Sequence, residues 1–169
     1  MFKYFLSSAW FWLFYASVAL MFVYIAQYGF GIEPCQLCHW QRLPWFGLAF
    51  ISLLQWLRPM RVRLFYTLIM ILGLVSLALS TYHSGIEYGL WQGPASCSGD
   101  RASQSLKNGM SMADLLAKAE ASRIIPCDQP SWVIDFSAFK LSFAGLNILA
   151  SMLWLGLIIY IKRLSKTHG

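Results

Sequence analysis

The stretch PCQLCHWQR, residues 34–42, combines residue types that could carry out redox chemistry. Cys35 and Cys38 stand three positions apart, and thiols in such a Cys-x-x-Cys motif often have lowered pKa values and exchange readily with disulfides. Arg42 follows about one helical turn after Cys38, where its guanidinium could stabilise a thiolate or donate hydrogen bonds to a carbonyl oxygen of a ligand. The motif therefore predicts a dithiol that is oxidised by an external acceptor.

Two further cysteines, Cys97 and Cys127, complete a set of four. Four cysteines allow three pairings, and the simplest joins Cys35 to Cys38 and Cys97 to Cys127. A Cys97–Cys127 bridge could be a structural staple contributing about 3–4 kcal/mol, or, if exposed, a target for the thiolate of another protein. Structural zinc is disfavoured because it usually takes a second closely spaced pair of ligands.

The composition identifies lipid as the solvent of this chain. Of its 169 residues, 58% are hydrophobic, 17% are aromatic and only 12% are charged. A typical soluble domain is about 45–50% apolar and about 25% charged. A soluble protein of this size could not bury so much apolar surface, so we predict an integral membrane protein.

Four apolar runs are long enough to cross a bilayer, which takes about 20 helical residues. They cover residues 4–28, 38–57, 64–82 and 142–161. The first run is too long and too aromatic for a cleaved signal peptide, whose apolar region has about 7–15 residues. We therefore predict an all-α membrane protein with a single domain over residues 1–169. Its fold would be an antiparallel four-transmembrane-helix bundle with a long extracytoplasmic loop between helices three and four.

The charges in the connecting segments predict the orientation. Seven basic residues and no acid lie before the first run, between the second and third, and after the fourth: Lys3, Arg58, Arg61, Arg63, Lys162, Arg163 and Lys166. All seven acids lie in the other two loops, residues 29–37 and 83–141. The positive-inside rule then places both termini in the cytoplasm and all four cysteines on the extracytoplasmic side, where the periplasm or another oxidising compartment permits disulfides. The net charge of +6 is a topology signal and not a nucleic-acid footprint.

Arg42 and His83 are the candidate ligand-binding residues. A charge at membrane depth is costly and marks a functional site by default, although Arg42 could instead extend to the interface. In a membrane the accessible organic acceptor is a quinone, whose carbonyl oxygens gain negative charge on reduction and favour preorganised donors. His83, just beyond the expected end of the third run, could be a second donor or a proton relay, or could simply be solvated.

Two other features have open interpretations. Several aromatic side chains could line a quinone pocket or form the usual interfacial belt; they are Trp45, Phe46, Tyr82, Tyr88 and Trp91. Residues 111–121 have a capping-box-like start and an apolar stripe at helical spacing. They predict a short helix that could lie on the membrane surface or be a plain surface helix.

The motif Pro34-Cys35-Gln36-Leu37-Cys38, followed by Gln41-Arg42, resembles the P-C-x-L-C-x-x-x-R signature of the disulfide bond formation protein B (DsbB) family. The four runs, the basic inner segments and the second cysteine pair resemble that family over nearly the whole chain. The resemblance implies a protein-dithiol:quinone oxidoreductase of the bacterial inner membrane. Such an enzyme reoxidises a periplasmic DsbA-like dithiol oxidase and passes the electrons to ubiquinone or menaquinone.

The resemblance also implies roles for single residues. Cys97 would form the mixed disulfide with the partner, and the electrons would then pass from the Cys97–Cys127 pair to the Cys35–Cys38 pair. Cys38 would supply the thiolate that engages the quinone. Arg42 matches the family's quinone-associated arginine in spacing, and His83 falls near its membrane-edge histidine.

Three alternatives compete with this interpretation. A non-enzymatic membrane subunit with structural disulfides would keep Cys35–Cys38 resistant to reduction and tolerate changes at Arg42. A metal- or haem-handling protein is disfavoured because the histidines are scattered; they are His39, His83 and His168. A vitamin K epoxide reductase-like enzyme is disfavoured because that family's Cys-x-x-Cys lies late in its core.

Overall fold

The computed structural model describes residues 9–94, 111, 126–127, 133–136 and 139–167. Its four helices are α2 (Ala9–Tyr24), α3 (Gln36–Leu57), α4 (Val62–Glu87) and α7 (Phe143–Thr167). A wider π-helical turn, η1 (Ile25–Gly29), extends α2. The strands β1 (Val133–Phe136) and β2 (Phe139–Ser142) form an antiparallel hairpin in which Val133 pairs with Ser142.

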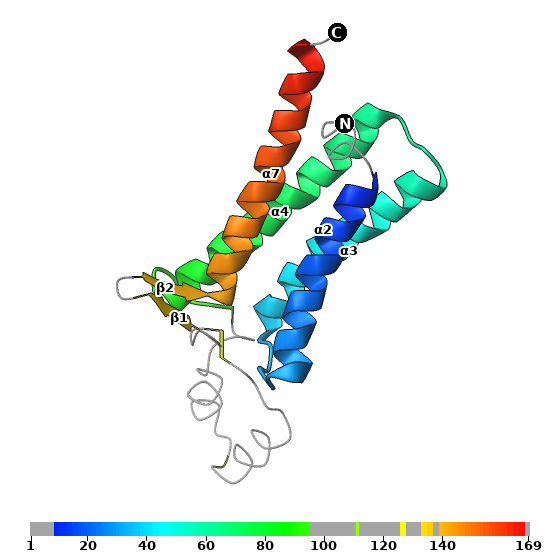
Figure 1. The fold of residues 1–169 in the computed structure, drawn as a ribbon. Coiled ribbons are helices and arrows are strands. Elements are labelled where there is room, and N and C mark those ends of the chain that lie inside the picture. The colour runs from blue at the N-terminus through cyan, green and yellow to red at the C-terminus, as the bar shows by residue number, and fades with distance from the viewer. Residues whose placement is uncertain (1–8, 95–110, 112–125, 128–132, 137–138, 168–169) are drawn as a thin grey trace.

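The four helices lie side by side and alternate in direction (Figure 1). Helix α2 packs on α3, α3 packs on α4, and α4 packs on α7. The first residue of α2, the α3–α4 connection and the last turn of α7 lie at one end of the molecule. The start of α3, the end of α4 and the hairpin lie at the other end. This arrangement brings Cys35, at the start of α3, to the same end as His83, near the end of α4.

Three of the helices are long and apolar enough to cross a membrane: Ala9–Gly29, Val62–Glu87 and Phe143–Leu164. They correspond to the first, third and fourth predicted spans, which supports a membrane protein. The second predicted span, residues 38–57, does form most of the 22-residue helix α3. However, α3 is not among the three apolar helices, because it carries polar residues such as Gln41, Arg42 and Gln55.

The loop predicted over residues 83–141 contains regular structure at both of its ends. Helix α4 continues to Glu87, so His83 lies on the helix and not beyond it. The helix ends in a Schellman motif, in which Leu90 N–H donates to the Gly85 carbonyl and Gly89 N–H to the Ile86 carbonyl. Gly89 takes the left-handed conformation that this motif requires, with φ 70°. The β1–β2 hairpin adds a two-stranded element that the all-α prediction did not contain.

The main buried core takes residues from all four helices and is rich in aromatic residues. Its fully buried members include Trp12 on α2, Leu48 on α3, Ile69 on α4 and Trp154 on α7. The α4–α7 contact is close because Ser76 and Ser151 share a hydrogen bond of 2.8 Å. Small residues at such contacts are typical of helix packing in membranes.

The outward faces of the helices are apolar. Phe14, Leu43, Phe50 and Val62 are each more than 60% exposed. Soluble monomers rarely expose so much contiguous apolar surface, so lipid is the expected neighbour of these side chains. Lys3, Cys97 and residues 112–121 of the predicted short helix lie outside the described residues.

Candidate redox site

Cys35 occupies the position that caps the N-terminus of α3. Its backbone is extended (φ −71°, ψ 171°), and its sulfur accepts a hydrogen bond of 3.2 Å from the backbone N–H of Cys38. The first amides of a helix lack intrahelical partners, and the helix dipole is positive there. Placing a Cys-x-x-Cys motif at this point favours the thiolate form of its first cysteine.

The sulfurs of Cys35 and Cys38 are 2.8 Å apart, and both residues are free thiols. A disulfide bond is about 2.05 Å long, so oxidation of this dithiol to a disulfide, with loss of two electrons and two protons to an acceptor, needs only a small movement of the two sulfurs. Cys35 is buried and Cys38 is partly buried. The hydrogen bond with Cys38 lowers the pKa of Cys35, and His83 lowers it further, against burial, which raises it.

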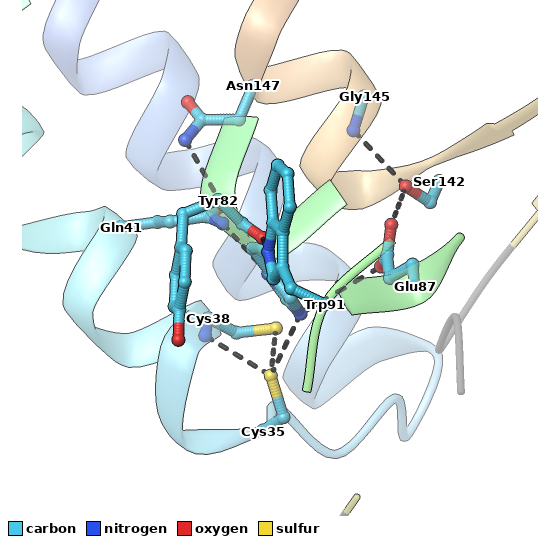
Figure 2. A network of polar contacts seen from close by, with 10 residues as sticks. Cys35, Cys38, Gln41, Tyr82, Glu87, Trp91, Ser142, Gly145 and Asn147 are labelled. Carbon is cyan, nitrogen blue, oxygen red and sulfur yellow. Dashed lines mark hydrogen bonds and ion pairs between the residues drawn. The ribbon is translucent and has the colours of Figure 1, made fainter. Parts of the chain in front are cut away.

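His83 joins this pair from α4. Its Nε2 lies 3.6 Å from the Cys35 sulfur and 3.9 Å from a carboxylate oxygen of Glu87. Glu87 in turn accepts a hydrogen bond from Ser142, whose hydroxyl also caps the start of α7 by accepting from Gly145 N–H (Figure 2). One carboxylate thus links the end of α4 to the start of α7 beside the cysteines.

A second set of polar side chains reaches His83 from the bundle interior. Gln41 Nε2 lies 2.8 Å from His83 Nδ1. Asn147 Nδ2 donates to Gln41 Oε1 at 3.1 Å, a contact that is also visible in Figure 2. Trp45 Nε1 donates to Asn147 Oδ1 at 2.9 Å. Residues from α3, α4 and α7 thereby form one hydrogen-bonded chain that ends at Cys35.

A cavity of about 490 Å³ opens beside Cys38. Its walls come mainly from α2, α3 and α7 and are mostly apolar, with side chains such as Leu20, Phe22 and Leu153. Its amide, thiol and guanidinium groups come from a few residues: Gln27, Cys38, Gln41, Arg42 and Asn147. An apolar cavity with a few convergent polar groups is the usual form of a small-molecule site.

Arg42 lines this cavity and is almost completely buried. Its Nη1 donates to Gln27 Oε1 at 2.7 Å, and its guanidinium lies over the Tyr24 ring at 5.1 Å from the centroid. In this structure, then, Arg42 hydrogen-bonds Gln27 and not Cys38. A guanidinium has five N–H donors, so the Gln27 contact leaves donors for a ligand in the cavity.

The structure brings five of the six predicted site residues to one end of the bundle. Cys35, Cys38 and His83 are in contact, and Arg42 lines the cavity that Cys38 borders. Cys127 is disulfide-bonded and packs in the same buried cluster as Cys35, and its backbone hydrogen-bonds His83. Cys97 lies outside the described residues.

Sequence reasoning missed Gln27, Gln41, Glu87 and Asn147. Two of them had a local signal, because Gln41 follows Cys38 by three residues and Glu87 follows His83 by four, which are helix-neighbour spacings. Of the aromatic candidates, Trp45 lines the cavity, and Phe46, Tyr82, Tyr88 and Trp91 are not among its lining residues. The rings of Tyr82 and Trp91 instead stack on each other, with their centroids 6.1 Å apart (Figure 2).

The described residues also contain one group that could ligate a metal. The ligand atoms of Cys35, Cys38 and His83 all lie within 4.8 Å of one another. The prediction against structural zinc rested on the spacing of the cysteine pairs and did not consider a histidine contributed from another helix.

Comparison with known proteins identifies the family. Residues 7–161 match the family model of "Disulfide bond formation protein DsbB". The chain is also 33% identical over 152 residues to "Uncharacterized protein RP370" of Rickettsia prowazekii (strain Madrid E). The aligned region covers 88% of this chain and 84% of that protein. No solved structure matches. With apolar helices that can span a membrane, a paired dithiol and a family model matched over nearly its whole length, the chain belongs to the DsbB family of disulfide bond formation oxidoreductases.

Proposed function

We propose that this protein reoxidises a DsbA-like dithiol oxidase and transfers the electrons to a membrane quinone. The observation that carries the proposal is the position of Cys38, which contacts Cys35 on one side and borders the Arg42-lined cavity on the other. A dithiol in that position can exchange with another disulfide and can also reach a ligand within the cavity.

The proposed reaction balances two electrons and two protons. A thiolate of the reduced partner attacks the Cys97–Cys127 disulfide, and the mixed disulfide is resolved by the partner's second thiol, which leaves the partner oxidised and Cys97 and Cys127 as thiols. These thiols then reduce the Cys35–Cys38 disulfide by exchange. Oxidation of Cys35 and Cys38 back to the disulfide releases two electrons and two protons, which the quinone takes up to become quinol.

The cavity suits a quinone in its chemistry. A quinone combines an apolar ring and tail with two carbonyl oxygens, and the cavity combines apolar walls with a few amide and guanidinium groups. Arg42, held by Gln27 and Tyr24, would donate to a carbonyl oxygen as negative charge develops there. The residues that border Cys38 therefore fit this acceptor.

The proposed setting is the bacterial inner membrane, with the cysteine end in the periplasm and both termini in the cytoplasm. Arg58 follows the last residue of α3, Arg61 precedes α4, and Arg63 is in the first turn of α4. The α3–α4 connection lies at the end of the bundle opposite the start of α3 (Figure 1). This separation of basic residues from cysteines agrees with the positive-inside rule and with an oxidising compartment for the cysteines.

Steady-state quinone reduction by the purified protein tests the proposal. A reduced DsbA-type protein serves as donor, and the absorbance of a short-tailed ubiquinone or menaquinone reports the product. We expect turnover that is lost in Cys97→Ser, Cys127→Ser, Cys35→Ser and Cys38→Ser. Absence of turnover with both quinones, while Cys35–Cys38 resists reduction, would instead favour a non-enzymatic subunit with structural disulfides.

A further inference from the structure

The hydrogen bonds that connect Trp45, Asn147, Gln41 and His83 to Cys35 run in a fixed direction from donor to acceptor. Trp45 sets this direction. The indole N–H of Trp45 can only donate, and it donates to Asn147 Oδ1 at 2.9 Å. The Asn147 amide is therefore oriented with its oxygen toward Trp45. Its nitrogen accordingly faces Gln41, where Nδ2 donates to Gln41 Oε1 at 3.1 Å.

The same logic passes through Gln41 to the imidazole. Since Gln41 Oε1 accepts from Asn147, the amide nitrogen of Gln41 faces His83 Nδ1, at 2.8 Å. An amide nitrogen has only donors, so His83 Nδ1 must accept. In the neutral ring the proton is then on Nε2, because the hydrogen bond made by one ring nitrogen decides the state of the other.

The surroundings of Nε2 agree with a proton on that atom. Nε2 lies 3.6 Å from the Cys35 sulfur and 3.9 Å from the nearer Glu87 carboxylate oxygen. A thiolate sulfur and a carboxylate oxygen are both acceptors. His83 and Glu87 are nearly fully buried, so water does not supply alternative partners.

We propose that Trp45, Asn147 and Gln41 are positioning residues that fix His83 in the Nε2–H tautomer and so aim an N–H donor at the Cys35 sulfur. We call this series of hydrogen bonds, from Trp45 through Asn147 and Gln41 to His83, the relay. The inference rests on the proposed function for its purpose: the donor stabilises negative charge on Cys35 during thiol–disulfide exchange. Trp45, Asn147 and Gln41 also line the cavity, so these lining residues act on Cys35 through His83.

The relay also predicts that this site of two thiols and a histidine disfavours metal binding. A histidine that ligates a metal presents a lone pair to the metal and usually donates its other ring N–H to an acceptor. Gln41 presents a donor to that other nitrogen, so Nε2 keeps its proton. The ligand atoms of Cys35, Cys38 and His83 are close enough for a metal, but the relay holds the histidine in the wrong tautomer for one.

Nitrogen NMR of the intact, reduced protein in detergent tests the tautomer directly. The chain has three histidines, so a sample labelled with ¹⁵N-histidine gives few ring signals, and His83→Asn identifies those of His83. We expect an unprotonated Nδ1 and a protonated Nε2 for His83 in the wild-type protein. A protonated Nδ1 with an unprotonated Nε2 would overturn the proposal.

Two isosteric variants should reverse the tautomer. In Gln41→Glu the carboxylate accepts from the imidazole, so Nδ1 becomes protonated. In Asn147→Asp the carboxylate accepts from Trp45 and from Gln41, so the Gln41 amide turns and presents its oxygen to Nδ1. Gln36→Glu, at an exposed position next to Cys35, is the matched control and should leave the His83 signals unchanged. Unchanged His83 signals in both Gln41→Glu and Asn147→Asp would contradict the relay.

Zinc binding gives a second readout that does not depend on activity. In the reduced Gln41→Glu protein, Nε2 is free to ligate beside two thiols, and we expect Zn²⁺ to bind at least about tenfold more tightly than to wild type or Gln36→Glu, in line with the effect of such partners on metal sites. Equal affinities would count against the relay. If the tautomer reverses as expected but wild-type protein reduces no quinone, the relay stands and the proposed function fails.

Discussion

The sulfur of Cys35 lies 3.6 Å from Nε2 of His83, although 48 positions separate the two residues in sequence. The contact joins the start of α3 to the last turns of α4 and puts the Cys-x-x-Cys motif beside an imidazole. It depends on α4 continuing to Glu87, because a helix ending at residue 82 would leave His83 in a loop.

The ionisation of Cys35 predicts a pH dependence of stability in the reduced protein. The hydrogen bond with Cys38 and the contact with His83 lower the pKa of Cys35 to about 4, whereas an unperturbed thiol has a pKa of about 8.5. A depressed pKa stabilises the fold fully above the unfolded value. That stabilisation is lost as the pH falls from about 8.5 toward about 4.

We therefore expect the thermal midpoint of the reduced protein to fall relative to that of the oxidised protein as the pH decreases through this range. Calorimetry or circular dichroism of both redox forms in the same detergent measures the difference. Cys35→Ser is the control, since it lacks the titrating thiol. A constant difference between the two forms across this pH range would show that Cys35 is not a low-pKa thiol.

Arg42 is expected to act on the quinone and not on the fold. Charge-assisted hydrogen bonds contribute about 1.5–3 kcal/mol, so Arg42→Ala should reduce kcat/KM for quinone by about 10- to 100-fold. Arg42→Lys should recover part of the loss, because a lysine keeps the charge but lacks the guanidinium geometry. Steady-state kinetics at varied quinone concentration give these values.

The matched control for Arg42 is Arg58→Ala, an exposed arginine at the opposite end of the bundle. It removes the same charge and should leave kcat/KM unchanged. If Arg42→Ala retained wild-type kcat/KM for both quinone types, the proposal that Arg42 donates a hydrogen bond to the quinone would be wrong.

The end of α4 should be sensitive to side-chain volume at Gly85. A Cβ there would lie 2.0 Å from the Trp91 ring, so Gly85→Ala must displace the indole, which also donates to the Tyr82 carbonyl at 2.8 Å. Overpacking of this kind costs about 1–3 kcal/mol. Thermal unfolding and the tryptophan fluorescence of Gly85→Ala, which keeps Trp91, report the change.

Gly156→Ala on α7 provides the comparison for Gly85. Among the described residues a Cβ at Gly156 would meet no atom within 4 Å, and replacing a helical glycine by alanine favours the helix by about 0.5–1 kcal/mol. Gly156→Ala should thus be neutral or stabilising. Equal stability of the two alanine variants would mean that Trp91 does not pack on Gly85.

The sequence was sufficient for the features that depend on local pattern. The length of the apolar runs located the apolar parts of the four helices, and the spacing of Cys35, Cys38 and Arg42 identified the motif that the family model supports. The end of α4 was misjudged because its last turns carry His83 and Glu87, whose polarity resembles that of a loop. The glycine at position 89 was the available signal for where that helix ends.

The relay could not have been predicted in the same way. Gln41 and Asn147 are 106 positions apart, and their contact depends on how α7 packs beside α3 and α4. Gln27 likewise meets Arg42 across the turn between α2 and α3. Single polar residues in apolar helices indicate that partners exist, but tertiary packing decides which partners they are.

A single-turnover experiment shows whether Cys35 and Cys38 themselves reduce a quinone. In a Cys97→Ser/Cys127→Ser double variant, Cys35 and Cys38 are the remaining thiols, and the fully reduced protein is mixed with excess quinone in the absence of any partner protein. We expect about one quinol per chain, with concomitant loss of both free thiols, and no quinol when Cys38→Ser is added, as expected for a two-electron couple. Persistence of both thiols without quinol formation would contradict electron transfer from Cys35–Cys38 to quinone.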